Sequence, residues 1–206
     1  MGAAQSAERA TTRADASWQA HHTLGAARDR LGQASAATAA YRAALEIVGK
    51  RDAERANVLF NLGRCCRASG DLGGAVEYLR GCLAASPKDG AAARELAVAL
   101  EAAGESEAAI AALREYLVRS PADLETTRAL GAILFSRGDL LEARGVFHGL
   151  AHRAPDDVDG LVRLGLVHAR LGDAREAEIS WRRALALDPA CVEARANLAG
   201  VRSPGV

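Results

Sequence analysis

Histidine and cysteine are the residue types in this chain that could supply metal-binding or nucleophilic chemistry. His148 and His152 are four residues apart, a spacing that places two imidazoles on one face of a helix. The segment reads HGLAH, however, and lacks the glutamate that a zinc protease carries between its two histidines. The sequence therefore favours surface or packing histidines over a metal site, and His168 is expected to pack beside Leu164 in a core.

The four cysteines are Cys65, Cys66, Cys82 and Cys191. Cys65 and Cys66 are adjacent, so they cannot chelate a metal in the way that a Cys-x-x-Cys pair does. Cys66 and Cys82 fall on expected core positions, where cysteine acts as a small apolar residue. Because no secretory signal is expected at the N-terminus, the sequence predicts reduced thiols and a cytoplasmic location.

No other arrangement in the sequence is typical of an enzyme. There is no glycine-rich phosphate loop, and no spacing indicates a Ser-His-Asp triad or paired catalytic carboxylates. The 26 Lys and Arg residues balance the 26 Asp and Glu residues, whereas a general nucleic-acid binder needs an excess of positive charge. No apolar stretch approaches the roughly 18 residues of a membrane-spanning helix. We therefore expect a protein that is not an enzyme, with no cofactor, no metal site, no nucleic-acid partner and no membrane insertion.

Three residue types recur in register along the chain, which indicates internal repeats. The spacing is 34 residues except between the first two copies, where it is 38. The leucines are Leu24, Leu62, Leu96, Leu130 and Leu164; the glycines are Gly32, Gly70, Gly104, Gly138 and Gly172; the alanines are Ala37, Ala75, Ala109, Ala143 and Ala177.

Each recurring position has a physical reason if every repeat is a pair of helices. The recurring glycines end the first helix in a left-handed conformation. A small residue after each leucine lets the two helices approach closely: Gly25, Gly63, Ala97, Gly131 and Gly165. A large side chain on the second helix fills the space towards the next repeat: Tyr41, Leu79, Leu113, Phe147 and Trp181. Pro87, Pro121, Pro155 and Pro189 stop the second helix, and Asp89, Asp123 and Asp157 are the expected N-caps of the next first helix.

With this period and these positions, the chain resembles tetratricopeptide-repeat (TPR) proteins. The resemblance implies an all-α fold, a TPR α-solenoid in which antiparallel helix hairpins wind into a right-handed superhelix. It also implies that first helices line a concave face, where family members bind an extended peptide or a helix. The repeats are expected at about 18–51, 56–89, 90–123, 124–157 and 158–191.

The remaining segments complete the expected domain organisation. Residues 1–17 are predicted to be a flexible polar segment, and 18–202 a single TPR domain. The four extra residues 52–55 amount to about one helical turn and are expected to lengthen a helix. Residues 192–202 resemble a first helix without a partner and are expected to cap the stack, followed by a tail at 203–206.

Projection of each first helix onto the concave face identifies apolar residues and arginines that the stack does not need. A groove of this kind suits a protein or peptide partner with acidic and apolar residues, because arginines pair with carboxylates in a bidentate manner. The alternative is that these are ordinary surface side chains. The candidate partner-binding residues are Asn57, Phe60, Arg64, Arg67, Arg94, Val98, Arg128, Phe135, Val162, Leu166 and Arg170.

The sequence thus predicts a non-enzymatic scaffold or adaptor that holds a partner peptide or helix in the concave groove, and the abundance of Arg and Ala suggests a bacterial source. Two alternatives stay open: a self-assembling TPR scaffold, and a chaperone for secretion or pilus components. TPR chaperone clamps that grip a C-terminal carboxylate carry Lys and Asn at fixed places. Here Arg64, Val98 and Ala132 occupy corresponding places, so that clamp is not expected.

Overall fold

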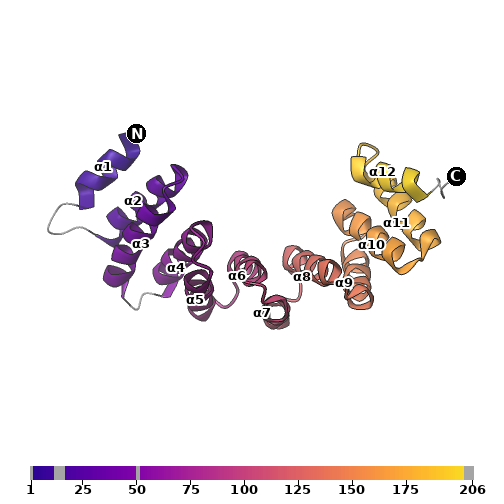
Figure 1. Ribbon diagram of the computed structural model, residues 1–206, viewed down its shortest axis with the longest axis horizontal. Coiled ribbons are helices and arrows are strands. Elements are labelled where there is room, and N and C mark those ends of the chain that lie inside the picture. Colours follow the sequence, from indigo (N-terminus) through magenta and orange to yellow (C-terminus); the bar gives the residue numbers. More distant parts are fainter. Residues whose placement is uncertain (1, 12–16, 50–51, 202–206) are drawn as a thin grey trace. The chain divides into compact units, whose positions relative to one another are not determined.

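The computed structural model describes residues 2–11, 17–49 and 52–201, which form twelve α-helices and no strand (Figure 1). No helix among these residues is both long enough and apolar enough to cross a membrane. The helices are α1 Gly2–Thr11, α2 Trp18–Arg30, α3 Ala34–Val48, α4 Asp52–Ala68, α5 Leu72–Ala85, α6 Gly90–Ala102, α7 Ser106–Arg119, α8 Leu124–Arg137, α9 Leu140–Arg153, α10 Val158–Leu171, α11 Ala174–Leu187 and α12 Val192–Val201.

The chain forms two compact units, Met1–Ser120 and Pro121–Val206. In the first unit, α2 pairs with α3, α4 with α5 and α6 with α7, and each hairpin packs on the next. In the second unit, α8 pairs with α9 and α10 with α11, and α12 packs on α11. Where one domain was predicted for 18–202, the structure has two compact units that divide after α7.

The two helices of a hairpin meet where a small residue on the first helix faces a large side chain on the second. A Cβ atom added to Gly63 would lie 2.5 Å from Leu79 Cγ, and one added to Gly131 would lie 2.6 Å from Phe147 Cζ. Trp181 covers Gly165 in the same way, and its ring is buried. These side chains therefore pack over the glycine of their own hairpin, and the close helix approach predicted from the sequence is confirmed.

The ends of the helices follow the predicted signals. Gly138 and Gly172 cap α8 and α10 with φ of 89° and 86°, a left-handed conformation that glycine adopts without steric cost. Asp89 accepts a hydrogen bond from the backbone N–H of Ala92 at 3.0 Å, as an N-cap does. Asp157 stands at the N-cap of α10 without a side-chain cap bond and faces Arg128 instead.

The N-terminal segment differs from its prediction. Gly2–Thr11 forms helix α1, which packs on α2 and is therefore not a flexible start. Ala7 forms a small cluster with Leu24 and Ala40, and Glu8 forms an ion pair of 2.9 Å with Arg28. The sequence did not indicate this helix, because it has no stripe of large apolar residues and Ala7 is its buried residue. Residues 12–16 lie outside the described part of the chain.

The insertion lengthens a helix, as predicted, and the C-terminal segment forms one further helix. α4 begins at Asp52 and has 17 residues, whereas the first helix of the following repeat, α6, has 13. The four extra residues therefore extend a helix. α12 packs against α11 and α10, where it buries Ala194. Arg202 and the predicted tail at 203–206 fall outside the described residues.

Candidate functional site

Within the part of the chain that the structure describes, no three His, Cys, Asp or Glu side chains gather so that they could hold a metal ion. His148 and His152 are both exposed on α9, and His168 is buried, as expected. The four cysteines are free and buried. Burial raises the pKa of the Cys65 and Cys82 thiols to about 12, so both are protonated at neutral pH and are poor nucleophiles.

Six of the candidate residues lie on the first helices of the Met1–Ser120 unit, and we call this surface the α4–α6 face: Asn57, Phe60, Arg64, Arg67, Arg94 and Val98. Arg64 of α4 lies 3.9 Å from Asp29 of α2, and its guanidinium carbon is 5.9 Å from the Phe60 ring centroid. Arg67 donates to Glu95 of α6 at 3.2 Å. The arginines of α4 therefore connect that helix to its two neighbouring first helices.

The apolar residues of the α4–α6 face differ in how far they reach solvent. Val98 is 47% exposed on α6. Phe60 is half-buried and packs against the core cluster that contains Leu59 and Cys82. An exposed apolar side chain of this size leaves a surface that a partner could cover, so Val98 is the clearest contact point of this face.

The side chain of His22 on α2 lies beside this face and contacts polar residues of α4. Asn61 donates to the backbone carbonyl of Asn57 at 3.0 Å and lies 3.1 Å from His22 Nε2. Burial lowers the pKa of His22 below its ordinary value, and a hydrogen bond with Asn57 opposes that shift. His22 is therefore neutral at pH 7 and adds no charge to the surface.

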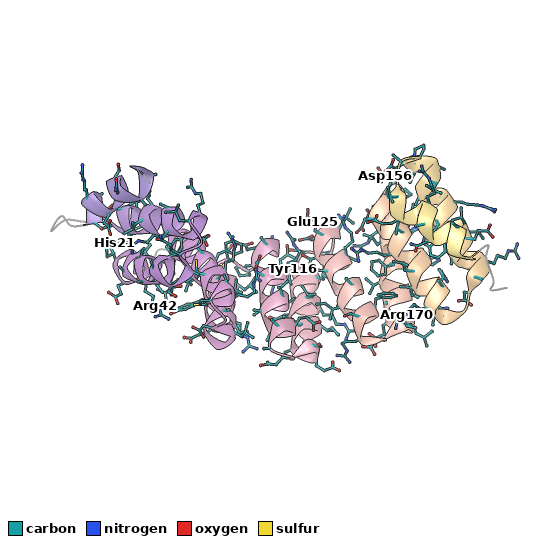
Figure 2. The ribbon with its side chains drawn as sticks, turned by 45° about the horizontal axis from the view of Figure 1, so that its top comes forward. His21, Arg42, Tyr116, Glu125, Asp156 and Arg170 are labelled. Carbon is teal, nitrogen blue, oxygen red and sulfur yellow. The ribbon has the colours of Figure 1, made fainter. Side chains whose placement is uncertain are left out.

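The other five candidate residues lie in the Pro121–Val206 unit, on α8 and α10, and four of them form the α8–α10 face: Arg128, Phe135, Leu166 and Arg170. Arg128 Nε lies 3.6 Å from Asp157 Oδ2. Arg170, labelled in Figure 2, places its guanidinium carbon 4.8 Å from the Phe135 ring centroid, within cation–π range. Here too, the arginines interact across neighbouring first helices.

The fifth residue, Val162, does not belong to this face. Its side chain is only 5% exposed, and its backbone carbonyl accepts a hydrogen bond of 3.1 Å from Trp181 Nε1. The prediction of Val162 as a partner-binding residue is therefore wrong. The reason is that α10 packs against α8, α9, α11 and α12, so more of its circumference is buried than the repeat pattern indicated.

The sequence reasoning also missed the acidic partners of the arginines. Asp29, Glu95 and Asp157 neutralise Arg64, Arg67 and Arg128 from neighbouring elements. A comparison of charges at adjacent first helices could have indicated these pairs.

Three family models match the chain, each described as a tetratricopeptide repeat, over residues 23–90, 67–133 and 158–191. A search of curated proteins finds no significant match. The matched ranges cover the repeats on both sides of the division between the two compact units.

Many solved structures share the fold. YrrB, described as a TPR protein with an unusual peptide-binding site, has a TM-score of 0.66 and 19% identity, with 94% of this chain and 98% of that chain covered. MamA from Desulfovibrio magneticus RS-1 has a TM-score of 0.68 and 16% identity, with 85% and 97% covered. A TPR protein from Parabacteroides merdae has a TM-score of 0.74 and 17% identity, with 89% and 72% covered. Together with the three family models, this shared helix-hairpin fold shows that the chain belongs to the tetratricopeptide-repeat family.

Proposed function

We propose that the chain is a non-enzymatic protein-interaction scaffold that holds segments of a partner protein on its α4–α6 and α8–α10 faces. The observation that carries the proposal is the exposure of Val98 on the first helix α6, three residues after Glu95, which pairs with Arg67 of α4. The TPR family supports protein interaction in general. YrrB, which shares the fold, is described as having a peptide-binding site.

Apolar contact supplies most of the affinity in this proposal. A partner side chain that covers Val98 and the edge of Phe60 removes apolar surface from water, at roughly 25 cal/mol per Å². A partner carboxylate adds less, because it must compete with Asp29 and Glu95 for the arginines of α4. The partner segment is therefore apolar with a few acidic residues, and the acids set its direction along the face.

Two exposed valines of the same unit allow a matched test. Val98 lies on α6, a first helix, and Val118 lies on α7, a second helix, with 83% of its surface exposed. A random peptide library displayed on phage is selected on the immobilised wild-type chain, and the selected peptides are then titrated against Val98→Asp and Val118→Asp. We expect Val98→Asp to weaken binding about tenfold or more, because it buries a charge against apolar side chains.

Val118→Asp is expected to bind the same peptides with wild-type affinity. Equal affinity for wild type and Val98→Asp would place peptide binding elsewhere and overturn the assignment of the α4–α6 face. Circular dichroism melts of both variants accompany the titration, since each substitution replaces an exposed side chain and should leave the fold intact.

A further inference from the structure

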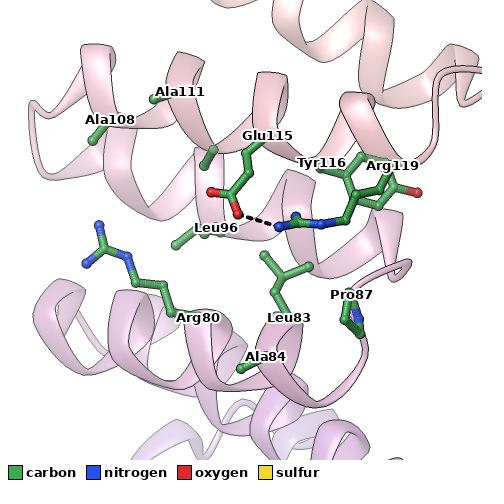
Figure 3. A pocket seen from close by; sticks show the side chains of 11 residues that line it. Arg80, Leu83, Ala84, Pro87, Leu96, Ala108, Ala111, Glu115, Tyr116 and Arg119 are labelled. Carbon is green, nitrogen blue, oxygen red and sulfur yellow. Dashed lines mark hydrogen bonds and ion pairs between the residues drawn. The ribbon is translucent and has the colours of Figure 1, made fainter.

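A groove lies between α5 and α7, the second helices of two consecutive repeats in the Met1–Ser120 unit (Figure 3). Its volume is 620 Å³, inside the range of about 300–1,000 Å³ that is typical of ligand pockets. No part of the α4–α6 face contributes to it. The lining residues from α5 and its C-terminal loop are Arg80, Leu83, Ala84 and Pro87; the remaining lining comes from Leu96 of α6 and from six residues of α7.

The walls of the groove are apolar, and its charged side chains differ in whether they pair with another residue of the lining. Leu83, Leu96 and Ala112 supply aliphatic surface. Glu115 and Arg119 pair with each other at 2.8 Å on the α7 side. Arg80 extends from α5 towards the opening, and Figure 3 shows no bond from it to the other residues that line the groove. A guanidinium with five N–H donors thus faces an apolar groove without an acceptor from that lining.

The preceding pair of second helices shows what fills such a groove. Between α3 and α5, the side chain of Tyr78 packs against two core clusters, together with Leu45. Its hydroxyl accepts a hydrogen bond of 3.1 Å from Arg42 Nε. The ring covers the space between the helices, and the arginine satisfies the hydroxyl at the surface.

The repeat register relates the two grooves residue by residue. The offset of 38 residues between the first two repeats carries Arg42 to Arg80 and Leu45 to Leu83. The offset of 34 residues to the next repeat carries Tyr78 to Ala112. The groove between α5 and α7 therefore keeps the arginine and the leucine of the filled site, and it has an alanine where the tyrosine stood.

We propose that this groove binds a tyrosine side chain of a partner protein. The ring lies against Leu83, Leu96 and Ala112, and the phenol oxygen accepts a hydrogen bond from Arg80, as Tyr78 does from Arg42. Burial of an aromatic ring whose polar end reaches a donor is the arrangement that tyrosine prefers at interfaces. A free carboxylate suits the groove less well, because Glu115 stands on its wall. The chain then has a partner surface on its second helices that is separate from the α4–α6 face.

The test uses p-cresol, the side chain of tyrosine, and toluene, which lacks the hydroxyl. Each is titrated into the ¹⁵N-labelled full chain while amide chemical shifts are recorded. We expect saturable p-cresol shifts at Leu83, Leu96 and Ala112, and about five- to tenfold weaker binding of toluene, because one charge-assisted hydrogen bond is lost. Arg80→Met keeps the aliphatic stem and should reduce p-cresol affinity to that of toluene.

Ala112→Tyr restores the tyrosine within the chain and should abolish the p-cresol shifts by occupying the groove. Val118→Tyr, at an exposed position of α7 that does not line the groove, is the matched control and should leave them unchanged. Equal binding of toluene and p-cresol to wild type would overturn the role of Arg80. Shifts that persist in Ala112→Tyr, or that map outside α5–α7, would overturn the groove as a tyrosine site.

A second copy of the chain is the competing occupant. Sedimentation velocity distinguishes a second copy from a partner protein. A wild-type dimer that dissociates in the Ala112→Tyr variant would overturn the partner proposal. Monomeric wild type and monomeric Ala112→Tyr would support it. Val98→Asp separates this inference from the proposed function. That variant should bind p-cresol as wild type does, whereas Ala112→Tyr should bind peptides selected on the α4–α6 face as wild type does.

Discussion

At Gly165 the missing side chain is occupied by a neighbour, since the Trp181 ring lies where a Cβ atom would be. The same position pairs Gly25 with Tyr41 and Gly131 with Phe147. The ring of Trp181 cannot simply move away, because its Nε1 donates to the carbonyl of Val162 and its surface is buried. The size of the aromatic ring therefore requires a glycine at this position of the first helix, because the ring occupies the space of a side chain.

We expect Gly165→Ala to destabilise the protein by about 1–3 kcal/mol, the usual cost of overpacking a filled core. Gly145→Ala is the matched control, because Gly145 is an exposed helical glycine of the same unit with no atom within 4 Å of its added Cβ. That control should stabilise by about 0.5–1 kcal/mol through helix propensity. Urea denaturation followed by circular dichroism measures both. Equal effects of the two substitutions would contradict the steric argument.

The buried thiols give a second prediction at this scale. Burial raises the pKa of Cys65 and Cys82 to about 12, and also raises that of Cys66. Since the thiolate is the nucleophile, these thiols should remain unmodified by iodoacetamide at pH 8 while the chain is folded. Peptide mass spectrometry after alkylation, with a urea-unfolded sample as the reference, checks this. Rapid alkylation of Cys65 in the folded protein would show that its surroundings open readily.

The sequence indicated the residues of the α4–α6 face, but not the acids that pair with them. Arg67 and Glu95 lie on different helices, and their contact depends on how two repeats are rotated about each other. The repeat pattern fixes which side of a helix faces its own hairpin. It does not fix the pairing of long side chains across repeats, and it did not reveal that α10 contacts four other helices and that Val162 is buried.

At the scale of helices, the predicted ends hold because each depends on local chemistry. A proline stands two residues beyond the end of each of α5, α7, α9 and α11. The side-chain caps are less uniform: Asp89 bonds the first turn of α6, whereas Glu105 precedes α7 without such a bond. The position in the repeat therefore predicts where a helix begins more reliably than it predicts how the cap is made.

This difference can be measured. Asp89→Ala should destabilise the protein by about 1 kcal/mol, since it removes an acceptor from the first turn of α6. Glu105→Ala should cost at most a few tenths of a kcal/mol, because the charge acts only on the dipole of α7. Urea unfolding of the two variants in parallel gives the comparison. A larger loss for Glu105→Ala would contradict the assignment of the caps.

At the scale of the whole chain, the division into two units is the feature that the sequence did not indicate. The 34-residue pattern passes through Ser120 and Pro121 without interruption, and the proline there is the same helix stop as in other repeats. The recurring residues of the 34-residue pattern predict the contacts between the two helices of one hairpin. The packing between one hairpin and the next depends on surfaces that the pattern leaves variable.

We expect the two units to respond separately to destabilisation. Leu62→Ala removes a fully buried side chain of the first unit, which should cost about 2–5 kcal/mol. Amide hydrogen exchange followed by mass spectrometry should then show faster exchange in α4 and α5, and unchanged exchange in α10 and α11. Faster exchange throughout the chain would indicate one cooperative unit instead.

The two tryptophans of the chain make these units optically distinguishable. Trp18 begins α2 in the first unit, with its ring centroid 6.0 Å from that of His22, and Trp181 lies in the core of the second unit. The half-buried indole and the fully buried one should differ in emission wavelength, and protonation of His22 should quench only the first. Intrinsic fluorescence of single-tryptophan variants therefore records the melting of each half of the protein without any added dye.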